Sequence, residues 1–102
     1  MKVIIESPYK GDLFHGRGLF DNIDYARDCM SNSLSRGESP FVSHLLYTQV
    51  LDDDIPEERH LGMSSALEWY AVADLCAVYI DRGISEGMAS GIKHAKEIGL
   101  TV

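Results

Sequence analysis

One stretch of the sequence, from residue 75 to residue 88, constrains the fold more than any other. Residues 75–80 are continuously apolar, and they lead directly into the polar, glycine-containing segment 81–88. A short apolar run bounded by turn residues is typical of a buried strand, and the segment after it opens a helical pattern. In open α/β sheets this order forms a crevice at the carboxyl end of the strand, where helix N–H groups favour anionic or hydroxyl-rich ligands. The sequence therefore predicts a ligand crevice at this loop.

The rest of the chain repeats the alternation of strand and helix. Strands are predicted at residues 3–5, 40–42 and 75–80, with a short last strand from Thr101. Helices with apolar residues at three- and four-residue spacing are predicted at residues 22–36, 54–71 and 85–98. For residues 45–51 the spacing of the apolar residues does not distinguish a helical turn from a loop. The order predicts an α/β fold, a Rossmann-like three-layer sandwich with a mostly parallel sheet of four to five strands.

Length and composition indicate a single domain over residues 1–102. The hydrophobic fraction is 45% and the charged fraction is 25%, and no apolar run approaches the ~20 residues that a membrane span requires. No secretory pattern follows Met1, so a cytoplasmic location is expected. A formal net charge of −7 opposes binding to polymeric nucleic acid, whereas a helix N-terminus can still hold a small nucleotide. A homo-oligomer is expected because the domain is small and acidic.

Metal and cofactor chemistry is not predicted. Cys29 and Cys76 are expected to be free, buried thiols, and the histidines lack the spacing of a metal site. The sequence also lacks the signature motifs of dinucleotide oxidoreductases, P-loop NTPases, α/β-hydrolases and zincins. We therefore expect no metal and no cofactor.

Polar residues that follow the predicted strands are the candidate ligand contacts, because the carboxyl ends of parallel strands meet at one edge of a sheet. They are Ser7, Pro8, Tyr9, Asp12, His44, Asp81, Gly83, Ser85, Gly87 and Met88. Asp81 is placed to hydrogen-bond ligand hydroxyls, although Asp-Arg-Gly is equally common in turns. Ser85 is expected to be the N-cap of the last helix, a position from which it can also contact a phosphate.

Some of these candidates can be interpreted in two ways. They are Tyr9, His44 and the neighbouring carboxylates. The ring of Tyr9 either stacks on a base or packs over the end of the sheet. His44 is either a base that faces the ligand or a hydrogen-bonded structural residue. Carboxylates near one apolar-walled site can differ in pKa, one serving as nucleophile or base and another as acid. Glu58 can also belong to a solvated helix start.

Six segments together resemble a family of small uncharacterised proteins found in bacteria and phages. They are residues 6–9, 22–27, 36–41, 43–48, 56–59 and 81–88, and the match covers nearly the whole chain apart from residues 13–20. That family is similar to the nucleoside 2-deoxyribosyltransferase superfamily, which includes nucleotide N-glycosidases. The Ser-Pro-Tyr loop, Ala73-Asp74 and the Asp-x-Gly loop carry this second resemblance, which implies a nucleoside 2-deoxyribosyltransferase-like fold and a nucleoside or nucleotide ligand.

The resemblance also bears on catalysis. In those enzymes a glutamate on the last helix is the nucleophile at the sugar C1′, assisted by an aspartate and a first-loop tyrosine. Alignment on the Asp-x-Gly loop puts that position at Gly87, and alignment on the helix end puts it at Gly91. Neither glycine can attack a substrate. The resemblance therefore implies a domain that senses or sequesters a nucleotide-derived small molecule.

Two alternatives remain open at this stage. The first is an active nucleotide N-glycosidase or deoxyribosyltransferase that uses a displaced carboxylate, either Glu86 or Glu58. Asp81 would then orient the sugar, and His44 would act as acid or base. The second is an oligomeric scaffold whose crevice is vestigial.

Overall fold

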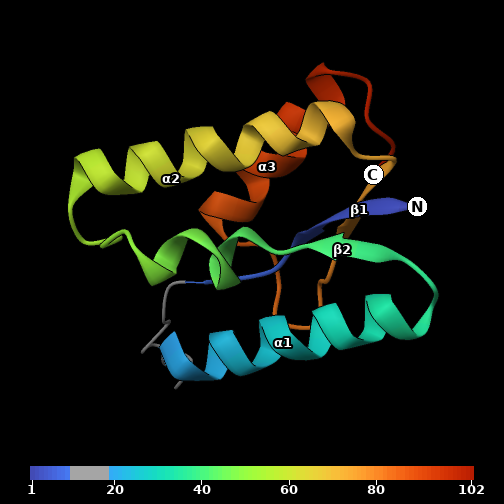
Figure 1. Cartoon of the computed structure of the whole chain (residues 1–102), viewed down its shortest axis with the longest axis horizontal. Helices are drawn as coiled ribbons and strands as arrows, with labels where there is room; N and C mark the ends of the chain where they lie inside the picture. Colours follow the sequence, from blue (N-terminus) through green and yellow to red (C-terminus); the bar gives the residue numbers. More distant parts are fainter. Residues whose placement is uncertain (10–18) are drawn as a thin grey trace.

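Three parallel strands lie between two layers of helices in the computed structural model, which describes residues 1–9 and 19–102 (Figure 1). The strands are β1 (Lys2–Glu6), β2 (Ser39–Phe41) and β3 (Leu75–Val78). The α-helices are α1 (Leu19–Ser35), α2 (Pro56–Glu68) and α3 (Glu86–Glu97). The short 3₁₀ helices are η2 (Ser43–Leu45), η3 (Tyr47–Gln49) and η4 (Trp69–Val72). The predicted α/β class and parallel sheet are confirmed, and the undecided residues 45–51 contain 3₁₀ turns.

The sheet has fewer strands than the sequence predicted. Its order is β2-β1-β3, and β1 pairs in parallel with both neighbours. Thr101 makes only an isolated parallel bridge to Leu75, in which the Cys76 N–H donates to the Thr101 carbonyl at 2.7 Å. A single bridge does not build the ladder of about three or more residues that defines a strand. The expectation of four to five strands is therefore not confirmed, because the sheet of the described residues has three.

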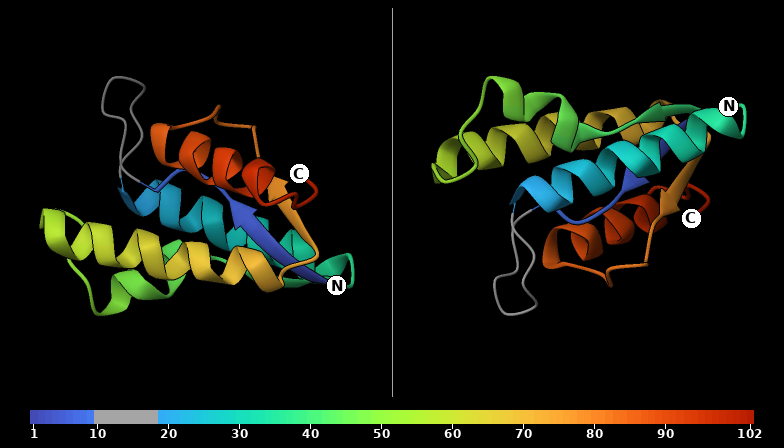
Figure 2. Two further views of the ribbon diagram at one scale, coloured as in Figure 1. Left: turned by 90° about the horizontal axis from the view of Figure 1, so that it is seen from above. Right: turned by 90° about the horizontal axis from the view of Figure 1, so that it is seen from below.

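β1 is the centre of the core because both of its faces are buried. Val3, Ile4 and Ile5 are 1%, 3% and 3% exposed. Alternate residues of a strand point to opposite faces, so Val3 and Ile5 pack with Cys29 and its neighbours on α1, whereas Ile4 packs with Ala95 of α3. Figure 2 shows α1 over one face of the sheet and α2 and α3 over the other. This is the three-layer arrangement that the sequence predicted.

Local sequence signals set the ends of the elements. Gly37 and Gly99 follow α1 and α3 with φ values of +79° and +78°, a conformation that costs glycine little and ends a helix. Ser85 is the N-cap of α3, as predicted, and accepts a hydrogen bond from the Met88 N–H at 3.2 Å. Cys29 and Cys76 are free and buried, also as predicted.

One negative finding concerns membranes. Across residues 1–9 and 19–102, no helix combines the length and the apolar character needed to cross a bilayer.

Substitution of Val3 by alanine should destabilise the fold. Val3 is 1% exposed, so its loss removes buried methyl groups and leaves a cavity, at a cost of roughly 2 kcal/mol in the free energy of unfolding. Val50 is 79% exposed and provides the matched control, because Val50→Ala should change that free energy by less than about 0.5 kcal/mol. Urea unfolding followed by circular dichroism measures both. Equal effects of the two substitutions would contradict the central place of β1 in the core.

Candidate functional site

The turns after β1 and β2 are joined by a histidine. His44 in η2 donates from Nε2 to the Ser7 carbonyl at 2.6 Å, and its ring stacks on Tyr9 with centroids 5.3 Å apart. A carbonyl can only accept a hydrogen bond, so Nε2 carries the proton. Burial lowers the pKa of His44, which keeps the ring neutral near pH 7. In this structure the imidazole holds two turns together.

The turns after β1 and β3 are joined through the start of α1. Asn22, which is 2% exposed, donates from Nδ2 to the Tyr9 carbonyl at 3.3 Å and accepts at Oδ1 from Arg82 Nη1, also at 3.3 Å. The Arg82 guanidinium also lies 4.7 Å from the centre of the Tyr25 ring. Burial, followed by the nearby Cys29 thiol and Asp81 carboxyl, raises the pKa of Tyr25. Asp81 is therefore close to α1.

These contacts place the three turns at one edge of the sheet, away from both termini (Figure 1). Sequence reasoning did not select Asn22, Tyr25 or Arg82 for this edge. They lie within two of the segments that carry the family resemblance, residues 22–27 and 81–88, but no local pattern indicates that the two segments touch.

The predicted contact residues differ in how far they are exposed. Ser7 and Pro8 are buried, and Tyr9 and His44 are half-buried. Asp81, Gly83, Ser85, Glu86 and Gly87 are exposed, while Met88 is 1% exposed and belongs to the core. Asp12 lies outside the described residues. The exposed members belong to the loop after β3 and the first turn of α3, whereas Ser7 and Pro8 are buried directly after β1.

The Ser7 hydroxyl is a buried polar group without a hydrogen-bond partner among the described residues. The residue as a whole is 0% exposed. Buried polar atoms in native proteins nearly always have a partner, so each exception requires an explanation. This hydroxyl lies at the edge where the three turns meet.

Glu6, the last residue of β1, is a buried acid that sequence reasoning missed. It is 5% exposed and accepts a hydrogen bond from the Tyr70 hydroxyl. Burial raises the pKa of Glu6 from 4.5 to about 7, and the bond from Tyr70 partly opposes that rise. The available signal was a carboxylate directly after the apolar residues of a strand predicted to be covered on both faces.

Gly91 in α3 has no side chain, and the carboxyl group of Glu6 occupies the space that a side chain there would need. A Cβ built at position 91 would lie 2.7 Å from both Glu6 Cδ and Tyr70 Oη, whereas one at Gly87 would meet nothing within 4 Å. A side chain at position 91 and the carboxyl of Glu6 therefore compete for the same volume. Of Gly87 and Gly91, only Gly91 is packed against the carboxyl group of Glu6.

The two carboxylates predicted as displaced nucleophiles have other surroundings. Glu58 accepts a hydrogen bond at Oε1 from the Asp52 N–H at 3.1 Å, which connects it to the segment before α2. Glu86 is exposed in the first turn of α3. Neither is as buried as Glu6.

Comparisons with known proteins agree with this fold. A family model described as "Domain of unknown function (DUF7768)" matches residues 1–102. No curated protein matches the chain. Among solved structures it is similar to a 2-deoxyribosyltransferase from the psychrotolerant bacterium Bacillus psychrosaccharolyticus, a biocatalyst for nucleoside synthesis, with a TM-score of 0.68 and 14% identity over 97% of this chain and 67% of that chain. The predicted resemblance to the deoxyribosyltransferase fold is confirmed.

Two glycine substitutions on α3 should have opposite effects on stability. Gly91→Ala forces a methyl group against Glu6 and Tyr70, so the free energy of unfolding should fall by about 1–3 kcal/mol. Gly87→Ala meets open space on the same helix, and alanine's better helix propensity should raise that free energy by up to about 1 kcal/mol. Urea unfolding checks both. A stabilising effect of Gly91→Ala would show that Glu6 does not occupy this position.

The raised pKa of Glu6 makes stability depend on pH. Between pH 4.5 and about 7 the folded state holds more protons than the unfolded state, so this contribution to stability is present at low pH and is lost as pH rises. At about 1.4 kcal/mol per pKa unit the loss is on the order of 3 kcal/mol. Glu6→Gln keeps an acceptor for Tyr70 but cannot titrate. The difference in unfolding free energy between the two proteins, measured across pH, should show this slope, and parallel curves would contradict the burial of the carboxyl.

Proposed function

The chain belongs to the family described as "Domain of unknown function (DUF7768)", and we propose that it binds a nucleoside or nucleotide and senses or sequesters that molecule. The binding site in this proposal is the edge where the three strand-terminal turns meet. The role requires no catalytic step, in keeping with the absence of a carboxylate at Gly87 and Gly91.

The observation that carries the proposal is the set of contacts that join the three turns. His44 bonds to the Ser7 carbonyl, and Asn22 bonds both to the Tyr9 carbonyl and to Arg82. In the sheet order β2-β1-β3 the chain crosses from β1 to one side and then back past it to the other. Ligands of open α/β sheets bind outside the carboxyl ends of the strands at such a reversal. These contacts therefore support a preformed site.

The groups at this edge suit the parts of a nucleoside or nucleotide. Tyr9 offers an aromatic ring beside the end of β1, and Asp81 offers an exposed carboxylate for sugar hydroxyls. Ser85 and the first N–H groups of α3 favour a phosphate or hydroxyl oxygen. The net charge of −7 supports a small molecule over polymeric nucleic acid as the partner. A cytoplasmic location is part of the same proposal.

A second function is favoured by one specific observation. In an N-glycosidase or deoxyribosyltransferase with a displaced carboxylate, Glu6 is a better candidate than Glu86 or Glu58. Its carboxyl fills the volume that a side chain at Gly91 would take, and a pKa of about 7 suits proton transfer at neutral pH. This alternative keeps the same crevice and the same class of ligand.

A panel of nucleosides and nucleotides tests both functions. We expect at least one member to raise the melting temperature of the purified chain without release of its base, as followed by chromatography. Asp81→Asn should weaken the affinity by about 10- to 100-fold, because it replaces a charged acceptor of ligand hydroxyls. Asp28→Asn, an exposed acid on α1, is the control and should bind like the original chain.

The other outcomes separate the alternatives. Base release that is abolished by Glu6→Gln, and retained in Glu58→Gln and Glu86→Gln, would replace the binding role with the enzymatic one. The absence of any shift in melting temperature and of any base release across the whole panel would contradict both functions and leave a scaffold.

A further inference from the structure

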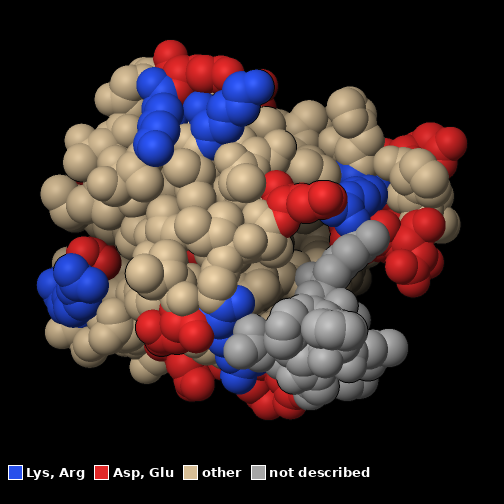
Figure 3. Space-filling model, turned by 180° about the vertical axis from the view of Figure 1, so that it is seen from behind, with Lys and Arg blue, Asp and Glu red and all other residues tan. Residues whose placement is uncertain are grey.

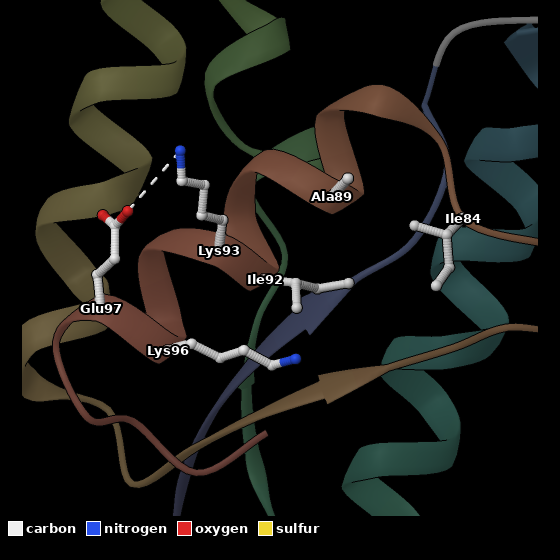
Figure 4. Close-up of a pocket in the computed structure, with 6 residues that line it drawn as sticks. All are labelled: Ile84, Ala89, Ile92, Lys93, Lys96 and Glu97. Carbon is white, nitrogen blue, oxygen red and sulfur yellow. Dashed lines mark ion pairs between the residues drawn. The ribbon is translucent and has the colours of Figure 1, made fainter.

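The side of the molecule that carries β3 and α3 has a hollow beside the loop that follows β3. It is lined by Ile84, Ala89, Ile92, Lys93, Lys96 and Glu97. In Figure 4, Ile84 from the loop after β3 and Ile92 from α3 point toward one another across it, and Lys96 extends beside Ile92. The hollow thus has apolar walls and charged groups at the far end of α3.

Apolar side chains in the segments that follow β3 and α3 are exposed, and one of them, Ile84, lines the hollow. Ile80, Ile84, Ile98 and Val102 are 64%, 58%, 45% and 49% exposed. β3 is an edge strand, and within the described part of the chain only the single bridge to Thr101 pairs with its outer side. The face seen from behind has a broad area without charged side chains, and the charged groups gather toward its margin (Figure 3). Because Ile84 and Ile92 line the hollow and Lys96 and Glu97 lie at its far end, it has the apolar walls and charged margin that are typical of a protein interface.

The charges beside the hollow indicate which partner fits. Lys93 and Glu97 form an ion pair at 3.9 Å, and Lys96 lies one residue from Glu97 on the same helix. A two-fold interface brings one patch against its own copy, so the patch must carry both the cation and the anion that pair across it. This patch carries both.

We propose that the face formed by α3 and residues 80–84 is a two-fold self-association surface, in which Ile84 and Ile92 pack against the same face of a second copy and Lys96 of each copy pairs with Glu97 of the other. Ile84 lies in the loop that also carries Asp81 and Ser85. The second copy therefore supports the outer side of the crevice loop, whose inner side is held by Arg82 against α1.

The mass of the full chain in solution, measured by sedimentation velocity over a wide range of concentration, tests this surface. We expect a dimer, and Ile84→Glu should raise its dissociation constant at least about a hundredfold, because each copy then buries an unpaired carboxylate. Leu34 on α1 is 57% exposed against 58% for Ile84, so Leu34→Glu is a matched control that should leave the dimer intact. Circular dichroism and urea unfolding establish that both variants are folded.

Charge exchange tests the orientation. Lys96→Glu or Glu97→Lys alone places like charges across the interface and should weaken the dimer at least about tenfold, whereas the double exchange should restore it. A chain that is monomeric at every concentration would overturn the proposal, including the case in which this face serves a different protein. A dimer that survives Ile84→Glu, or a double exchange that fails to restore it, would also overturn the proposal.

Discussion

The parallel pairing of β1 with a strand on each side is the constraint on which the rest of the structure depends. Its apolar residues are buried on both faces, so α1 must cover one face while η4 and α3 cover the other. All three strands point the same way, and each therefore delivers its following turn to the same edge of the sheet. Turns that are distant in sequence are brought to one edge for this reason.

At that edge the chain accepts unfavourable burial of polar groups. Glu6, the last residue of β1, and Ser7, which follows it, are 5% and 0% exposed, where apolar side chains would be less costly to bury. Burial raises the pKa of Glu6 to about 7. Tyr70 supplies a hydrogen bond, and Gly91 supplies the space. Residues of β1, η4 and α3 thus all lie around one carboxyl group. Groups with such a perturbed pKa cluster at functional sites.

The loop after β3 contributes to both the proposed ligand site and the proposed self-association surface. Arg82 reaches inward to the start of α1, where it contacts the Asp21 carbonyl and the Tyr25 ring. Ile84, two residues later, faces outward into the hollow beside α3 (Figure 4). A second copy that packs on Ile84 and a ligand that contacts Asp81 would both restrain the same short loop. Self-association and ligand binding are therefore expected to reinforce each other.

The sequence by itself determined the alternation of strands and helices, because apolar period, caps and turn residues are local signals. It located β1, β3 and the N-cap at Ser85. A β-α-β order implies parallel strands, so the common edge of the turns also followed from sequence. The number of strands did not, because the pairing of Thr101 depends on how far it runs beside β3.

Only the tertiary structure decided which side chains meet at that edge. Glu6 and Tyr70 are 64 positions apart, and Asn22 and Arg82 are 60 apart. Such contacts depend on the way the helices pack across the sheet, which no period or spacing within a segment encodes. Sequence patterns therefore predicted the loops that form the site, whereas the buried carboxyl of Glu6 and the glycine that makes room for it became evident only once η4 and α3 were in place over β1.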